Sequence, residues 1–311
     1  MLITYKPWTK FISIGIVHPM IFPECGRGEG PILETASKIV NDDFFGAIEI
    51  SWVKDPEVRK KLGRLLSEGR LDIIFCGGPA MLAQKLDLNS SDSSIRKKAV
   101  EGTKQLIDEA YDDDAKICVI LSGSMPALIK KQSAISFLID SLKELCDYAK
   151  AHGKMMITLE NFDVEYEKKC LIGSTSDAAE VAKAVRKDCG NFGLTVDLSH
   201  LPLLQEKPEA VTAAGAYLEH AHMGNCIKND RSNPMYGDQH PRFGAPSGEN
   251  DVPELATFLR ALEKMDYFTK KAVTSKPVLS FEVKPAPGES SEAILAGSKR
   301  AFIEAWMRIS S

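Results

Sequence analysis

Short apolar runs alternate along this chain with longer amphipathic segments of helical period. The runs have the length and bounding turn residues of buried strands, and the segments between them place apolar side chains on one helical face. The strand-like runs are residues 11–17, 46–53, 71–78, 116–123, 154–162, 192–199, 217–224 and 277–283. The helix-like segments are residues 31–43, 55–69, 93–111, 127–153, 175–190, 207–216, 251–265 and 290–309.

Eight strand–helix units in one chain predict an α/β protein with a (β/α)8 TIM barrel, in a single domain over residues 1–311. A doubly wound open sheet is the competing arrangement. It would usually carry a glycine-rich phosphate loop after an early strand. The only comparable segment, GRGEG at residues 26–30, does not match that motif and is interpreted as a flexible loop.

Polar groups close four of the predicted strands. Glu160, Asp197, His222 and Glu282 each stand at or near the end of an apolar run, and a turn-like or charged segment follows. Because side chains alternate between the two faces of a strand, each of these residues shares a face with small or polar residues earlier in its run. If that face is the barrel interior, all four groups converge at the carboxyl end of the barrel, where barrel enzymes place their chemistry.

Three carboxylates and one imidazole make a mixed oxygen and nitrogen donor set. The set predicts one divalent metal ion, with Mn²⁺ favoured and Mg²⁺, Co²⁺ or Zn²⁺ also compatible. Glu160 and Glu282 are in addition the candidate catalytic acid and base. His220 shares the face of His222 but lies deeper in the strand, so we expect it to support the site rather than bind the metal.

Four further residues are candidates for substrate binding. His200 follows Asp197 by three residues, Asp238 and His240 form a D-x-H pair after the seventh run, and Lys284 shares the face of Glu282. We expect the D-x-H pair to lie near the substrate or to shape its loop, not to hold a second metal.

The charge balance limits the class of partner. With 39 basic and 43 acidic residues the net charge is -4, so no overall positive field attracts nucleic acid. No apolar run approaches the roughly 20 residues that cross a bilayer. The seven scattered cysteines form no CxxC pair, which favours reduced thiols and a cytoplasmic location. The expected partner is a small molecule, and a homo-oligomer is left open.

The motifs LENFD, VDLSH, HAHMGN and SFEVKP, with PSGENDVPELATFLRAL after the seventh run, resemble the xylose isomerase-like TIM-barrel superfamily of sugar isomerases and epimerases. The resemblance extends over nearly the whole chain. In its ketose 3-epimerase branch a Glu, Asp, His, Glu quartet holds the metal, which implies the four residues named above. The branch's D-x-x-H histidine, a substrate contact, falls on His200.

Two positions depart from the epimerase pattern. The substrate-gripping acid after the fifth run is left open between Asp163 and Glu165. The substrate-binding arginine after the seventh run is replaced by Lys228, with Arg231 as the nearest alternative.

The sequence therefore predicts a metal-dependent isomerase or epimerase that acts on a small carbohydrate or polyol through an enediolate. Such an enzyme would belong to carbohydrate metabolism. The alternative is a metal-dependent lyase on the same scaffold, either a dehydratase or an enzyme that cleaves 3-keto-glycosides. A phosphodiesterase resembling endonuclease IV is less favoured, because the second and third runs lack the histidines that it requires. A sugar-binding relative without turnover is the non-enzymatic alternative.

Overall fold

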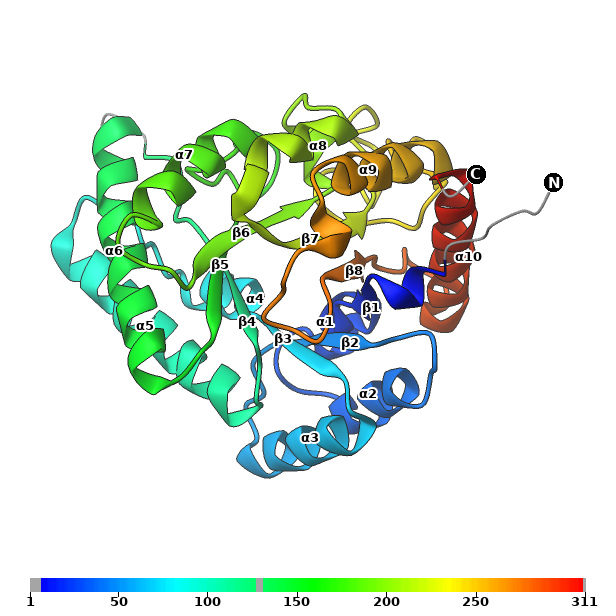
Figure 1. Cartoon of the computed structure of the whole chain (residues 1–311), viewed down its shortest axis with the longest axis horizontal. Helices are drawn as coiled ribbons and strands as arrows, with labels where there is room; N and C mark the ends of the chain where they lie inside the picture. The colour runs from blue at the N-terminus through cyan, green and yellow to red at the C-terminus, as the bar shows by residue number, and fades with distance from the viewer. Residues whose placement is uncertain (1–6, 127–130, 310–311) are drawn as a thin grey trace.

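The computed structural model describes residues 7–126 and 131–309 and forms the predicted barrel (Figure 1). Its eight strands make one parallel sheet in the order β1-β8-β7-β6-β5-β4-β3-β2. The strands are β1 (Ser13–Ile16), β2 (Ala47–Ile50), β3 (Asp72–Cys76), β4 (Ile117–Leu121), β5 (Met156–Glu160), β6 (Phe192–Asp197), β7 (Leu218–Gly224) and β8 (Val278–Glu282). Each lies inside one of the predicted apolar runs.

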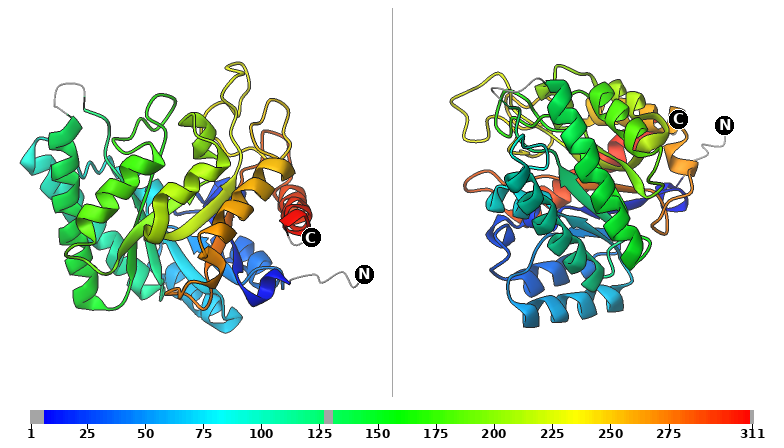
Figure 2. Two further views of the ribbon diagram at one scale, coloured as in Figure 1. Left: turned by 45° about the horizontal axis from the view of Figure 1, so that its top comes forward. Right: turned by 90° about the vertical axis from the view of Figure 1, so that its left-hand side faces the viewer.

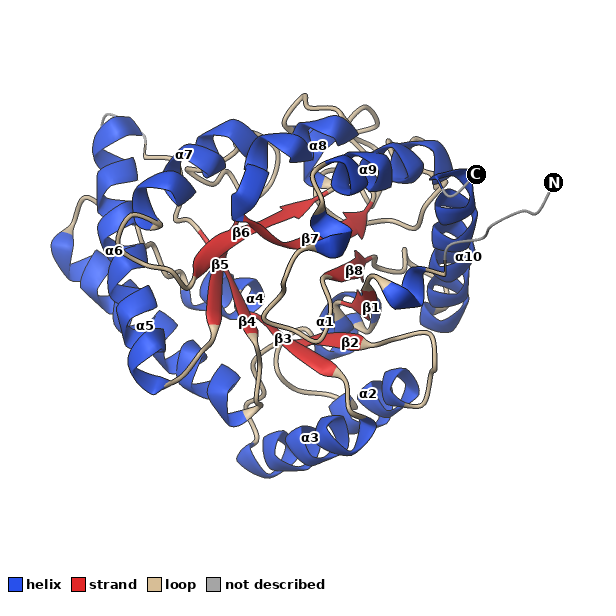
Figure 3. Ribbon diagram, viewed as in Figure 1, coloured by secondary structure: helices blue, strands red, loops and turns tan. Residues whose placement is uncertain are grey.

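Helices surround the sheet on its outer side (Figure 3). The α-helices are α1 (His18–Ile21), α2 (Ile32–Val40), α3 (Pro56–Gly69), α4 (Gly78–Gln84), α5 (Ser93–Asp112), α6 (Lys131–His152), α7 (Thr175–Val185), α8 (His200–Leu203), α9 (Val252–Lys264) and α10 (Ser291–Ile309). Four 3-10 helices, η1 (Trp8–Lys10), η2 (Pro23–Cys25), η3 (Pro208–Tyr217) and η4 (Tyr267–Thr269), complete the described elements. The first residues of the helix predicted over 127–153 lie outside the described residues.

The barrel closes loosely between its first two strands. The other neighbouring strands form parallel ladders, with a register shift between β6 and β7, whereas β1 and β2 meet, among the described residues, at the bridge between Val17 and Glu49. On the other side of β1 the strands approach closely, since a Cβ atom at Gly15 would lie 2.4 Å from Oγ of Ser280. Only glycine fits at this point of the barrel interior.

The barrel interior confirms the predicted side-chain alternation. A small apolar cluster fills its lower part and consists of Ala47, Ile74, Ile117, Val119, Met156 and Val278. Above it, Thr195 donates a hydrogen bond to Thr158 between β6 and β5 at 2.8 Å. The inward faces of β5 and β8 therefore run from an apolar residue below, Met156 or Val278, to a candidate ligand at the carboxyl end. A much larger apolar core lies between the strands and the helices.

One predicted helix differs from expectation. Residues 207–216 were predicted to be an amphipathic helix, but they form the 3-10 helix η3, which is broken at Gly215 with φ 54° and ψ -137°. Four alanines and a glycine provide little side-chain packing to favour a regular α-helix over this irregular crossover.

All seven cysteines are buried, and none of them is in a disulfide within the described residues. Across residues 7–126 and 131–309, no helix combines the length and the apolar character that a membrane span needs.

The loops at the carboxyl end of the barrel are the longest. The segment between β7 and α9 rises above the barrel beside the segment that follows β5 (Figure 2). These two segments carry Asp238, His240 and Lys168, so they form the wall of the candidate site.

Candidate metal centre

The structure brings the four predicted ligands together at the carboxyl end of the barrel. Donor atoms of Glu160, Asp197, His222 and Glu282 all lie within 4.8 Å of one another, and each side chain is buried. The sheet register explains this, because Asp197 pairs with His222 across β6 and β7, and Glu160 and Glu282 end their own strands. The geometry and the donor chemistry both fit a divalent cation.

His222 lies at the centre of the group. Its Nδ1 atom is 2.7 Å from Oε2 of Glu282 and 3.2 Å from Oε1 of Glu160. Asp197 is held by its own loop, where it accepts a hydrogen bond from the backbone N–H of Ser199 at 2.8 Å and a second from that residue's hydroxyl. These contacts orient the ligands before any cation binds.

Glu49 is a member of the site that sequence reasoning missed. It lies on the inward face of β2, is fully buried, and places its two oxygens 3.1 Å from Nε2 of His222. The available signal was one glutamate within an otherwise apolar strand, on the same face as Ala47. A carboxylate behind a metal-binding histidine is a recurrent arrangement that fixes the orientation of the ring.

His220 lies beneath His222, as expected of a supporting residue. Its Nε2 is 2.6 Å from Oε1 of Glu49, and its Nδ1 is 3.2 Å from the carbonyl oxygen of Val278. Glu49, His220 and His222 also form a group of donors compact enough for a cation. Because both ring nitrogens of His220 already have partners, we assign it to the hydrogen-bond network.

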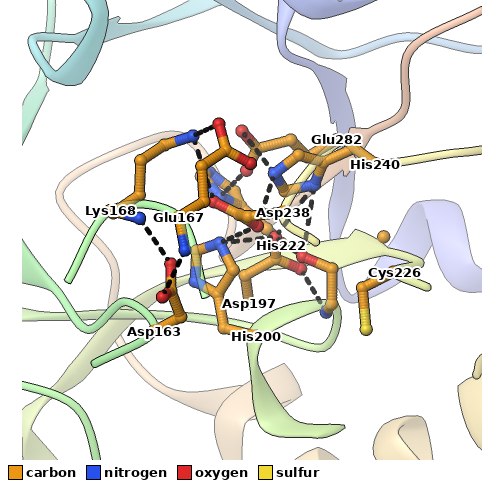
Figure 4. Close-up of polar contacts among 12 residues, drawn as sticks. Asp163, Glu167, Lys168, Asp197, His200, His222, Cys226, Asp238, His240 and Glu282 are labelled. Atoms are coloured by element: carbon orange, nitrogen blue, oxygen red, sulfur yellow. Dashed lines mark hydrogen bonds and ion pairs between the residues drawn. The ribbon is translucent and has the colours of Figure 1, made fainter. Parts of the chain in front are cut away.

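A second group of donors adjoins the first and shares Asp197 with it. Asp197, His200 and His240 have donor atoms within 4.8 Å of one another, and Asp238 lies between the two histidines (Figure 4). Oδ1 of Asp238 is 3.1 Å from Nε2 of His200 and 3.1 Å from Nε2 of His240. His200 directs Nε2 inward because its Nδ1 hydrogen-bonds to the carbonyl oxygen of Asn161 at 2.8 Å.

Several atoms of this second group lack hydrogen bonds of good geometry. They are Nε2 of His200 and both carboxylate oxygens of Asp238. Polar atoms that are buried in this way usually find a partner, so the group is arranged for a positive charge. The structure thus brings Asp238 and His240 to the candidate metal centre.

Burial and neighbouring charges separate the carboxyl groups electrostatically. Burial raises the pKa of Glu160 to about 7, with His222 opposing the rise. Burial also acts to raise the pKa of Glu282, but His240 and His222 together lower it to about 2. The pKa of His240 is raised to about 9, because Glu282 and Asp238 outweigh the opposing effect of burial. In the absence of a cation, Glu160 thus takes up a proton near neutral pH and Glu282 remains ionised.

A cavity of about 260 Å³ opens onto this centre. Of the four predicted ligands, only Glu160 and Glu282 line it, whereas Asp197 and His222 are fully buried behind them. The predicted substrate residues Asp238, His240 and Lys284 line it as well. His200 is fully buried and is not among the lining residues. The remaining wall is mostly apolar and includes Pro19, Met20, Leu82, Leu121 and Phe162.

The structure separates the two candidate acids after β5. Asp163 is fully buried and accepts hydrogen bonds from the backbone N–H groups of Tyr166, Glu167 and Lys168, at 2.6 to 2.8 Å. Glu165 is exposed and lines a different hollow, which contains Lys228 and Arg231. Neither acid lines the cavity at the metal centre, so each lacks a direct path to a substrate there.

Comparison with known proteins places the chain in a family. The family model for the xylose isomerase-like TIM barrel matches residues 42–299. An uncharacterised protein of Methanocaldococcus jannaschii, MJ1311, is 26% identical over 186 residues, a match that spans 58% of this chain and 57% of that relative.

Solved structures share the fold at low sequence identity. L-ribulose 3-epimerase has a TM-score of 0.72 at 17% identity, covering 96% of this chain and 95% of its own. The IolI protein, solved with a bound zinc atom, has a TM-score of 0.72 at 15% identity, covering 96% of this chain and 99% of its own. Since the family model matches well over half of the sequence, this chain belongs to the xylose isomerase-like TIM barrel family.

Proposed function

We propose that this protein is a divalent-metal-dependent isomerase or epimerase that acts on a small carbohydrate or polyol through an enediolate. The observation that carries the proposal is the placement of the quartet. Asp197 and His222 are buried as anchors, while Glu160 and Glu282 face a cavity that is large enough for a single small substrate. The fold shared with L-ribulose 3-epimerase supports it.

The quartet would hold the cation, with Mn²⁺ as the favoured ion and Zn²⁺ supported by the zinc atom in the related IolI structure. A bound divalent cation would polarise a substrate carbonyl and acidify the neighbouring C–H bond. Glu160 and Glu282 contribute the proton transfers, because each has a carboxylate at the cavity wall. The apolar wall excludes water from the reacting carbon, and Lys284 is placed to bind a substrate oxygen from the rim.

A second candidate function is favoured by one specific observation, the donor group of Asp197, His200, Asp238 and His240 beside the quartet. If that group held a second ion, the pair of ions would suit the hydrolysis of a phosphate ester. The isomerase remains the better supported function, because the early strands contribute Glu49 and Cys76 to this end of the barrel instead of histidines.

The test is a screen of the metal-loaded protein against free ketoses and 3-keto sugars in D₂O, read by NMR and mass spectrometry. We expect deuterium at one carbon of a product that has the mass of the substrate apart from the label. Loss of water or of a glycosyl group from the substrate would show that the protein is a lyase instead. Hydrolysis of a phosphodiester, without deuterium exchange into any sugar, would show that it is a hydrolase instead.

Two variants connect the activity to the site. We expect Glu160→Gln and Glu282→Gln each to lose roughly a hundredfold or more in turnover, as the removal of a general acid or base does. An amide still offers an oxygen to the cation, so both variants should keep part of their metal. Full activity in either variant would exclude that residue as a proton carrier.

A further inference from the structure

Lys168 is a charged side chain at the candidate centre that the proposed mechanism does not use. It lies in the segment after β5, and its Nζ atom is 3.5 Å from Oδ2 of Asp238 and 2.7 Å from Oε1 of Glu167 (Figure 4). Its side chain is 19% exposed, whereas the side chain of Asp238 is completely buried. The ammonium is therefore shared between Asp238 and Glu167 and lies closer to Glu167.

The backbone around Lys168 is fixed by Asp163. The carboxylate of Asp163 accepts three consecutive backbone N–H groups, and the last of these belongs to Lys168 at 2.8 Å. A carboxylate with three such bonds holds a turn firmly. The rigid turn therefore limits where the ammonium of Lys168 can lie and keeps it near Asp238.

A network of side chains holds the ammonium from the other direction. Glu167 accepts from Lys168 on one oxygen and from the side-chain amide of Gln239 on the other, at 2.8 Å. Gln239 in turn accepts from Lys284 at 3.0 Å. Three loops at the mouth of the barrel thus meet at Lys168, which also lines the cavity.

The charges of the second donor group explain what the lysine does there. Asp197 is shared with the quartet, so Asp238 is the one carboxylate that the second group adds. Its Oδ1 atom is contacted by His200 and His240, and its Oδ2 atom faces the ammonium of Lys168, which Glu167 also contacts. A doubly charged ion bound by Asp238 would therefore lie within a few ångströms of that ammonium in a buried space, where like charges repel strongly.

We propose that Lys168 is a built-in cation that takes the place of a second metal ion beside Asp238 and so restricts the centre to one divalent ion. Lys168 then determines which chemistry this barrel can support. A single ion at the quartet serves proton abstraction beside a carbonyl, whereas two ions serve phosphate ester hydrolysis. The proposal rests on the quartet of the proposed function and on no particular substrate.

The experiment is a count of metal ions per chain. Protein stripped with a chelator is loaded with excess Mn²⁺ or Zn²⁺, passed through a desalting column and measured by inductively coupled plasma mass spectrometry. We expect one ion per chain in the wild type and two in Lys168→Met. Lys168→Arg, which keeps the charge, should bind one ion, and so should Lys169→Met, a matched change at the exposed neighbouring lysine.

Two results would overturn the inference. The first is two ions per chain in the wild type. The second is a folded Lys168→Met variant that still binds one. If that variant does not fold, Lys168→Gln takes its place, since it also removes the charge. Two ions per chain in Lys168→Gln support the inference, and one ion overturns it.

The count is independent of turnover, so this inference and the proposed function fail separately. One ion in the wild type and two in Lys168→Met, with no deuterium exchange into any sugar, would contradict the proposed isomerase function and leave the role of Lys168 intact. Deuterium exchange by a wild type that holds two ions would contradict the role of Lys168 and leave the isomerase function intact.

Discussion

The carboxylate of Glu49 accepts a hydrogen bond from Nε2 of His222, with both oxygens 3.1 Å from that nitrogen. Burial acts to raise the pKa of Glu49, but His222 and His220 outweigh it and hold the pKa well below its usual range. An ionised carboxylate can only accept, so the ring proton of His222 is on Nε2. Its Nδ1 atom faces Glu160 and Glu282 and is the nitrogen that a cation at the quartet would bind.

Glu49→Gln is expected to weaken metal binding by about 10- to 100-fold, the usual effect of losing a partner behind a metal-binding histidine. The neutral amide no longer fixes which nitrogen of His222 carries the proton. Competition titration with a chromophoric chelator measures the change in Kd. The matched control is Glu57→Gln, at an exposed position of α3. An unchanged Kd in Glu49→Gln would show that His222 is oriented without its help.

The fold was predictable because each strand is nearly all apolar and each intervening helix is amphipathic. That contrast survives errors of a few residues at the ends of elements, such as the predicted run 11–17 against the observed β1 over Ser13–Ile16. The crossover over 207–216 was predicted wrongly because alanine favours a helix locally, whereas η3 is shaped by how the chain returns to β7.

The candidate ligands at the strand ends were predictable from alternation alone. Glu49 was not, because the height of a side chain inside the barrel depends on the stagger between neighbouring strands, which no single strand reveals. The positions of Asp238 and His240 depend on an irregular loop, in which His240 has φ 52°. The sequence spacing reveals the D-x-H pair of Asp238 and His240. It does not reveal that His200 lies on the other side of Asp238.

Removal of the cation should lower the thermal stability of the protein. Three carboxylates of the quartet lie within 4.8 Å of one another and of His222, so a cation at the quartet would bind the folded state and not the unfolded chain. At a free metal concentration of a hundred times Kd, such binding adds about 2.7 kcal/mol of stability. Differential scanning fluorimetry with and without EDTA should show a melting temperature several degrees lower in EDTA, with recovery on addition of Mn²⁺.

The manganese complex of EDTA serves as the control, since a chelator that is already saturated with Mn²⁺ cannot remove that ion from the protein. A melting temperature that is the same in EDTA and in excess Mn²⁺ would contradict a structural role for the cation at the quartet.

Asp163→Ala is expected to destabilise the turn that carries Lys168. Loss of the carboxylate leaves three backbone N–H groups without their acceptor. Each such loss typically costs about 1 kcal/mol, so the total is on the order of 2 to 3 kcal/mol if water replaces part of the interaction. Urea denaturation measures the total, and limited proteolysis locates the loosened segment.

Glu165→Ala is the matched control, because Glu165 is two residues away and exposed. We expect it to leave stability and turnover unchanged. If Glu165→Ala lost turnover while Asp163→Ala did not, the acid that binds the substrate would be Glu165, and the substrate would have to reach the hollow beside Lys228.

Asp113 gives a dependence of stability on pH that is separate from the metal centre. It lies just after α5 and is 3% exposed, and its Oδ2 atom has no hydrogen bond. Burial, with the neighbouring charge of Glu109, raises its pKa to about 7. The unfolded chain releases this proton near the ordinary aspartate pKa of about 4. Between those two values the folded state binds more protons than the unfolded state, so the contribution of Asp113 to stability falls as the pH rises from about 4 to about 7.

Asp113→Asn removes the ionisable group and should therefore stabilise the protein at neutral pH, by up to about 4 kcal/mol, since the pKa shift is about three units and each unit corresponds to about 1.4 kcal/mol. The gain should vanish below about pH 4, where the carboxyl group of the wild type is neutral in both states. Urea denaturation at a series of pH values measures it, with Asp112→Asn at the exposed neighbouring position as a control for net charge. A gain that is constant with pH, or that is equal in the control, would show that Asp113 is not a neutral buried acid.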